Sequence, residues 1–242
     1  MPEPKTYRKH FDEDIERAQQ MLNLADRYEA DDGDTQIFRD VRYAGVAMAV
    51  GAMDAYFCDA YVDCLATSLK HYVRGQYPGE LPSVYANREL PAGVALDTSR
   101  QHRPLWALRM VARRIMEREN MLSSSRVKDE FNGILPTSHK LWVGIIDALI
   151  DLGKRRFTGV TPADLRGKKG KDREQLTKKA TKCFLDRLTN TIQWRHDWAH
   201  NCGRPKLRVD HFTKLQAKAR LSEIRDFVEI FDDHLENYRV VR

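Results

Sequence analysis

The chain has 242 residues, of which 31% are charged and 42% are hydrophobic, an ordinary composition for a soluble globular protein. Its net charge of +6 is compatible with an anionic partner, although it could equally serve solubility. The four cysteines form no C-x-x-C pair, which argues against a zinc ribbon or a disulfide framework and favours the reducing cytoplasm. We expect one domain over residues 1–242.

The N-terminus and the most apolar run argue against export and against a membrane. Residues 1–5 contain no apolar core of the kind that a signal peptide needs. The run from Tyr43 to Met53 is about half of the roughly 20 residues that a membrane span requires. We therefore expect a cytoplasmic protein with no membrane partner.

Two helices are predicted at the start of the chain. The first extends from His10 to about Ala30, and the second from about Gln36 to His71. The second has apolar or small residues every three or four positions, which is typical of a buried helix. These positions are Val41, Ala44, Met48, Ala52, Ala55, Cys58, Val62, Leu65 and Leu69. We expect this helix at the centre of a bundle.

Residues 75–104 are rich in proline and glycine and are predicted to form a long irregular insert. Pro104 suits the first turn of a helix that continues to about Asn120 and has an arginine-rich face. Three serines at 123–125 indicate a break, and the next helix is expected from about Ser138 to Leu152. The sequence does not show what the insert does.

The segment 154–182 is the most basic part of the chain, with eleven Lys and Arg against three Asp and Glu. Its candidate RNA-binding residues are Arg166, Lys168, Lys169 and Lys171. Such a segment binds phosphate backbones without sequence preference, but a solvated loop is an equal alternative. An accessory protein that binds duplex DNA is a further possibility, for which this segment is the sole support.

A motif helix is predicted over 172–203 and a last amphipathic helix over 210–238. Glycine at 203 and proline at 205 mark the end of the motif helix. We expect the last helix to pack against the motif helix as an antiparallel partner. Together these elements predict an all-α helical bundle with an irregular insert.

The end of the motif helix carries the densest set of ionisable side chains. Arg195 is a permanent cation suited to phosphate oxygens, and His196 and His200 are of the type that exchanges protons near neutral pH. Asp197 and Asn201 could orient an imidazole or a substrate hydroxyl. Such a set suits cleavage of a phosphodiester by its neighbouring ribose 2′-OH, which requires RNA.

The spacing constrains how this chemistry could be assembled. Arg195 and His200 differ by about 140° around an ideal helix and about 7.5 Å along it, which is poor for convergence on one atom. Either the last turn distorts, or two copies of the chain bring their motifs together across a two-fold axis. We favour the homodimer.

Neither a metal nor an organic cofactor is expected. His196 and His200 are four residues apart and Cys202 follows, but a fourth zinc ligand is not evident. The sequence has no G-x-G-x-x-G, P-loop or G-x-S-x-G motif, which argues against nucleotide cofactors, kinases and hydrolases of those types.

The run from Arg195 to His200, R-H-D-W-A-H, resembles the R-x4-6-H signature of HEPN domains, and the helical layout is most similar to the RiboL-PSP-HEPN type. The resemblance implies a helical-bundle dimer and a metal-independent endoribonuclease of a toxin, abortive-infection or antiviral system. It also implies that Arg195 and His200 are the catalytic pair and that His196 is the polar residue after the arginine. An antitoxin or another defence-system protein is a possible partner.

Asp54 lies on the central helix, where relatives in that group often carry an acidic residue. It is a candidate for orienting Arg195, the alternative being an exposed aspartate on the far side of the helix. For Arg195 and His200 the structural alternatives are an arginine that reaches water from the edge of the core and a histidine that caps the helix. The rival to an enzyme is a HEPN-like scaffold that binds RNA or protein and does not cleave.

Overall fold

The computed structural model describes residues 5–32, 36–81, 86, 104–116, 121, 123–201 and 213–239. Over these residues the chain is helical and has no strand, which confirms the predicted all-α fold. The elements are α1 (Thr6–Asp32), α2 (Gln36–Val73), α5 (Pro104–Met116), α6 (Ser124–Phe131), η1 (Thr137–His139), α7 (Leu141–Asp151), α8 (Arg155–Thr158), α9 (Pro162–Leu165), α10 (Gly170–Asn201) and α11 (Lys214–Tyr238).

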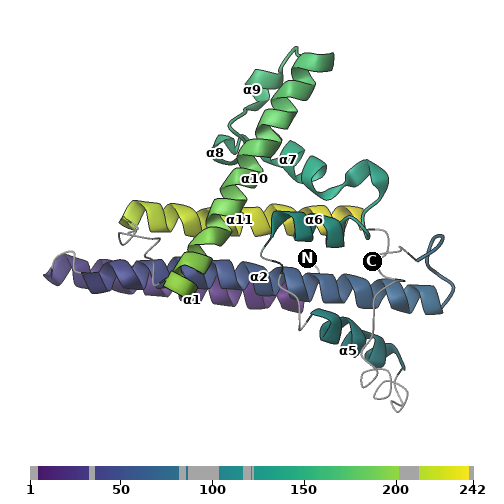
Figure 1. The fold of residues 1–242 in the computed structure, drawn as a ribbon, viewed down its shortest axis with the longest axis horizontal. Helices are drawn as coiled ribbons and strands as arrows, with labels where there is room; N and C mark the ends of the chain where they lie inside the picture. The colour runs from purple at the N-terminus through teal and green to yellow at the C-terminus, as the bar shows by residue number, and fades with distance from the viewer. Residues whose placement is uncertain are drawn as a thin grey trace.

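Helix α2 is the centre of the bundle, as its pattern predicted. Helices α1, α5, α10 and α11 all pack against it, and α1 and α11 lie along much of its length (Figure 1). Burial extends through α2 from Arg42 to Ser68. Among the described residues, none of the helices combines the length and the hydropathy needed to cross a bilayer.

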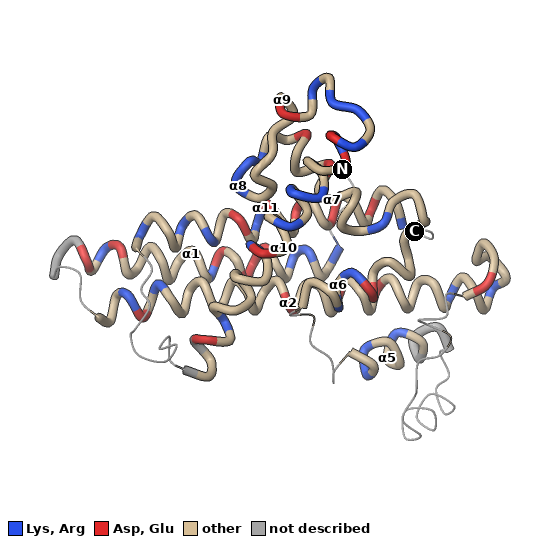
Figure 2. Tube along the Cα trace, turned by 45° about the horizontal axis from the view of Figure 1, so that its top comes forward, with Lys and Arg blue, Asp and Glu red and all other residues tan. Residues whose placement is uncertain are grey.

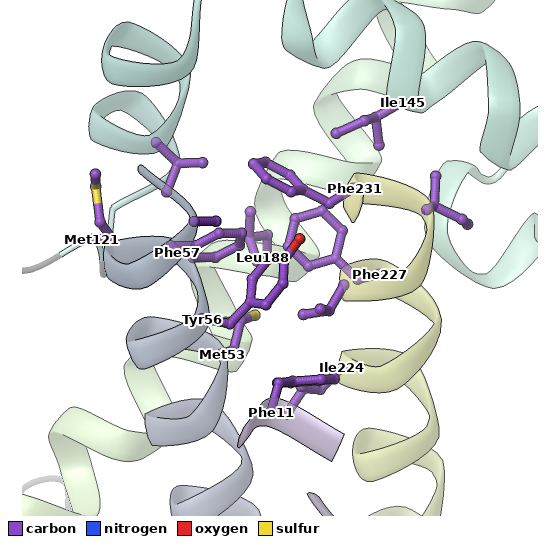
Figure 3. Packing of buried hydrophobic residues seen from close by; sticks show 14 of the residues in the cluster. Phe11, Met53, Tyr56, Phe57, Met121, Ile145, Leu188, Ile224, Phe227 and Phe231 are labelled. Carbon is purple, nitrogen blue, oxygen red and sulfur yellow. The ribbon is translucent and has the colours of Figure 1, made fainter. Parts of the chain in front are cut away.

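Aromatic side chains of α2, α6 and α11 meet in the core and form a cluster of ring contacts. The Phe231 ring contacts the rings of Phe57 and Phe131 edge-on, with centroids 4.9 Å apart in both pairs. Tyr56 and Phe227 complete the cluster (Figure 3). Edge-to-face contacts of this kind add to the free energy gained by burying the rings. The cluster joins three elements that are far apart in the sequence.

Helices α10 and α11 do not pack as the antiparallel pair that the sequence suggested. Helix α10 crosses α11 steeply (Figure 1), and large side chains such as Phe184 and Phe227 fill the crossing, with ring centroids 5.4 Å apart. The main partners of α11 are α1, α2 and α7. The apolar pattern predicted which faces are buried but not the angle between the helices.

Several boundaries also differ from the prediction. Helix α1 begins about a turn earlier than expected, and α10 begins at Gly170. Helix α6 was not predicted, because the serines at 123–125 were interpreted as a break. Ser123 is the N-cap of α6: its side chain accepts a hydrogen bond from the Arg126 N–H at 3.5 Å. Most of the 75–104 insert, and residues 202–212, lie outside the described residues.

One buried histidine makes stability depend on pH. The His234 ring is 5% exposed and lies against Gly144, where an added Cβ would come within 2.0 Å of its Cε1 atom. Its Nε2 atom is 3.1 Å from the carbonyl oxygen of His139. Burial lowers the pKa of His234, and the His139 side chain lowers it further, although the hydrogen bond to the carbonyl opposes this.

We therefore expect the free energy of unfolding to fall as the pH drops below about 6.5, because the unfolded state then binds a proton that the folded His234 resists. His234→Phe keeps a flat ring beside Gly144 and should reduce this dependence. Urea unfolding at several pH values, compared with the exposed-site control His10→Phe, measures the difference. Equal pH dependence in all three proteins would contradict the expectation.

Candidate functional site

Arg195 occupies a position on α10 where the helix faces α2. Its Nη1 atom is 3.5 Å from Oδ2 of Asp54, at the long limit of a hydrogen bond, so the contact is best described as an ion pair. A Cβ added to Gly51, one turn before Asp54, would lie 3.8 Å from the Arg195 Nε atom. The arginine therefore lies across a part of α2 that has no side chain.

Asp54 is held from a second direction. Its Oδ1 atom accepts a hydrogen bond from the backbone N–H of Met121 at 2.9 Å, so the two carboxylate oxygens have different partners. Burial raises the pKa of Asp54, although the Met121 N–H, Arg195 and His196 all act to lower it. The Arg195 side chain keeps 38% of its surface exposed, against 16% for Asp54. The guanidinium can thus reach solvent while the carboxylate stays covered.

His196 and His200 lie one turn apart on α10 beside this ion pair. Their rings are nearly parallel, at 15°, with centroids 5.9 Å apart. His200 is exposed and His196 is partly buried. Because α10 remains α-helical to Asn201, the described part of its last turn shows no distortion that would bring Arg195 and His200 together. Within one chain the pair remains divergent.

The other two predicted members of the motif are differently placed. Asp197 accepts a hydrogen bond from the Gln193 side chain at 2.9 Å, a contact along the helix surface rather than with a histidine. Asn201 ends the described helix, but its side chain lies outside the described part of the chain, as do Cys202 and the side chain of Trp198. The predicted role of Asp197 in orienting an imidazole or a substrate hydroxyl therefore stays a prediction.

A groove of about 540 Å³ opens next to the motif, between α10 and the start of α11. Its lining includes Gln193, Trp194 and Asp197 from α10 and Arg220 from α11. The Arg220 guanidinium lies over the Trp194 ring, 4.3 Å from its centroid, and also donates to Glu223 at 2.8 Å. The groove combines an aromatic face with hydrogen-bonding side chains.

The basic residues of the 166–171 loop lie at the opposite end of α10 from the motif. Arg166, Lys168, Lys169 and Lys171 are all exposed. Helix α10 has 32 residues, which makes it about 48 Å long at about 1.5 Å per residue. The loop leads directly into α10 along the sequence, but the length of the helix separates the loop from the motif in space.

Several contacts of the site could not be inferred from the motif. Gly51 had a weak signal, since it is three residues before Asp54 on a helix rich in small residues. Met121 and Arg220 had none, because their positions depend on how distant segments return to α2 and α10. In the part of the chain that the structure describes, no three His, Cys, Asp or Glu side chains gather closely enough to hold a metal ion.

Comparisons with known proteins add nothing to this geometry: no family model matches the chain, and no curated protein and no solved structure matches it either. Any function has to be inferred from the residues and their arrangement.

Proposed function

We propose that the chain is a metal-independent endoribonuclease of a toxin, abortive-infection or antiviral system, which cleaves RNA at a site composed of the motifs of two copies. The observation that carries the proposal is the setting of Arg195, a half-exposed cation held by Asp54 beside His196 and His200. These residues supply a cation, a base and an acid, the three groups that cleavage by the ribose 2′-OH requires.

The reaction follows from those groups. A histidine removes the proton of a 2′-OH, the 2′-oxygen bonds to phosphorus, and the bond from phosphorus to the 5′-oxygen breaks. A second histidine protonates the departing 5′-oxygen, and Arg195 stabilises the negative charge that develops on the phosphoryl oxygens. The products carry a 2′,3′-cyclic phosphate and a 5′-OH. His200 of one copy is the base, its symmetry mate is the acid, and His196 assists.

Two copies are part of the proposal because the α-helical geometry to Asn201 keeps Arg195 and His200 of one chain apart.

The two-fold arrangement can be tested by mixing wild-type and mutant chains. If the site needs His200 from both copies, adding an equal amount of His200→Ala chain and allowing exchange should lower the activity of a fixed amount of wild-type chain to about one half. A site contained within one chain predicts no loss.

The primary test is incubation of the purified chain with labelled single-stranded RNA in EDTA, followed by analysis of the product ends. Cleavage to 2′,3′-cyclic phosphate ends is the expected result. Cleavage that EDTA abolishes, or products with other ends, would rule out the mechanism.

The same ion pair also favours a second candidate. Because Asp54 partly neutralises Arg195, the site is compatible with a HEPN-like scaffold that binds RNA or a protein and does not cleave. Tight RNA binding by a chain that cleaves no RNA would support the scaffold.

Asp54 is proposed as a positioning residue for Arg195. Asp54→Asn keeps an oxygen for the Met121 N–H but removes the charge that holds Arg195, so we expect kcat to fall about tenfold. A matched substitution on the same helix, Asp59→Asn, should change kcat less than twofold. Separate kcat and KM values distinguish loss of positioning from loss of RNA affinity, and an unchanged kcat in Asp54→Asn would contradict the assignment.

A further inference from the structure

Four cations form an exposed patch at the N-terminal end of α10, which we call the basic tip and which consists of Arg166, Lys168, Lys169 and Lys171. In the described part of the chain, no carboxylate pairs with any of these four side chains, whereas Lys178 pairs with Glu174 at 2.6 Å. Figure 2 shows the basic residues gathered around this end, beside α9. Their charges are available to an anionic partner.

The cations of α10 are concentrated in its first half, where Lys171 is followed by Arg173, Lys178, Lys179 and Lys182. Beyond Lys182, the helix carries only Arg187 before Arg195. Arg187 is forked onto Glu223 and so contributes little free charge, with its Nε atom 3.0 Å from Oε2. The exposed residues in between include Asp186, Thr189 and Asn190, none of which is basic. Between Lys182 and Arg195, the helix therefore has a stretch of twelve residues, 183–194, in which the single cation is the paired Arg187, so the basic segment and the motif are not one continuous track.

The basic tip suits a duplex better than a single strand. Proteins that hold single-stranded nucleic acid combine cations with aromatic side chains on which bases stack. Residues 158–183 contain no Phe, Tyr or Trp, so the tip offers charge without a stacking surface. Double-stranded RNA, whose bases are internal, is recognised mainly through its backbone and shape.

The distance between the anchors sets the length of the partner. The distance from the basic tip to the motif is about 40 Å, because α10 is one continuous helix that rises about 1.5 Å per residue. A duplex of about 16 base pairs, the length that a double-stranded-RNA-binding domain covers, reaches over such a distance.

Building on the proposed nuclease function, we propose that the substrate is an RNA with a duplex segment of at least about 16 base pairs, which the basic tip holds, next to unpaired nucleotides that are cut at the motif. Unpaired nucleotides are needed there because the 2′-oxygen must line up with the departing 5′-oxygen, and the regular backbone of a duplex prevents that alignment.

The test compares three RNAs with the same unpaired segment of about ten nucleotides, which carry no stem, a stem of about 6 base pairs or a stem of about 16 base pairs. We expect kcat/KM to be at least about tenfold higher for the long stem than for the other two. A variant of the tip should reduce this ratio to near one. The tip variant is Arg166→Glu, Lys168→Glu, Lys169→Glu and Lys171→Glu.

A control variant has the same change in charge at exposed positions elsewhere and should retain the ratio. It consists of Arg27→Glu, Arg74→Glu, Arg113→Glu and Arg225→Glu. Equal kcat/KM for all three RNAs, or equal loss of the ratio in both variants, would overturn the duplex anchor while leaving the nuclease proposal intact.

If no RNA is cleaved, the nuclease proposal fails and equilibrium affinity for the same RNAs decides the duplex anchor. Binding at least about tenfold tighter for the long stem, with a salt dependence that weakens in the tip variant and not in the control, would support it. Equal affinity for the three RNAs would reject it.

Discussion

Replacing Arg195 or His200 with alanine is expected to lower RNA cleavage by about 10²- to 10⁴-fold, because each substitution removes a group that the proposed mechanism uses to stabilise the transition state. In the proposed mechanism, Arg195→Ala removes the cation that offsets charge on the phosphoryl oxygens, and His200→Ala removes the groups that transfer protons. The measurement is the single-turnover rate with labelled single-stranded RNA in EDTA.

The controls are matched by residue type. His10→Ala and Arg225→Ala remove the same side chains from exposed positions on α1 and α11 and should change the rate less than twofold. Thermal unfolding of all four variants shows whether a loss of rate reflects a loss of fold. Cleavage by His200→Ala at the rate of the parent would exclude its proposed role.

A large loss of stability is expected for Phe231→Ala, by about 3–5 kcal/mol, because the ring is fully buried and its removal leaves a cavity among four other aromatic rings. The control is Leu215→Ala on the same helix, whose side chain is 80% exposed and whose loss should cost less than about 0.5 kcal/mol. Urea unfolding monitored by circular dichroism measures both. Equal stabilities of the two variants would mean that the aromatic cluster does not hold α11 to α2.

The predictions from sequence were best where one helix carries a long, regular pattern. The apolar repeat of α2 from Val41 to Leu69 spans about eight turns, so its helical state and burial could be predicted from spacing alone. Helix α6 has eight residues and only two buried apolar ones, Val127 and Phe131, which is too short a pattern to separate from a loop. The prediction that α10 and α11 pack antiparallel was wrong, because the spacing of apolar residues defines which face is buried and not the angle at which two helices cross.

In the candidate site too, some contacts could be predicted from the sequence and others could not. The resemblance suggested Asp54 as a candidate for orienting Arg195, and the two side chains are in contact across 141 positions of sequence. The Met121 N–H and the Arg220 side chain could not be assigned in this way, since they arrive from segments whose path depends on the tertiary fold. The basic loop precedes the motif helix directly in the sequence, but a helix of this length holds the loop and the motif far apart.

Because of its ion pair with Asp54, Arg195 already has an anionic partner before any ligand binds. A phosphate that reaches Arg195 does not meet a bare cation: it exchanges with a carboxylate, or shares the guanidinium with it. The free energy of binding at this point is then the difference between two anionic partners rather than the full attraction of one. For the proposed nuclease we therefore expect lower affinity but higher selectivity at this point, because weak anions such as chloride gain little by the exchange, whereas a phosphodiester that also engages the histidines gains more.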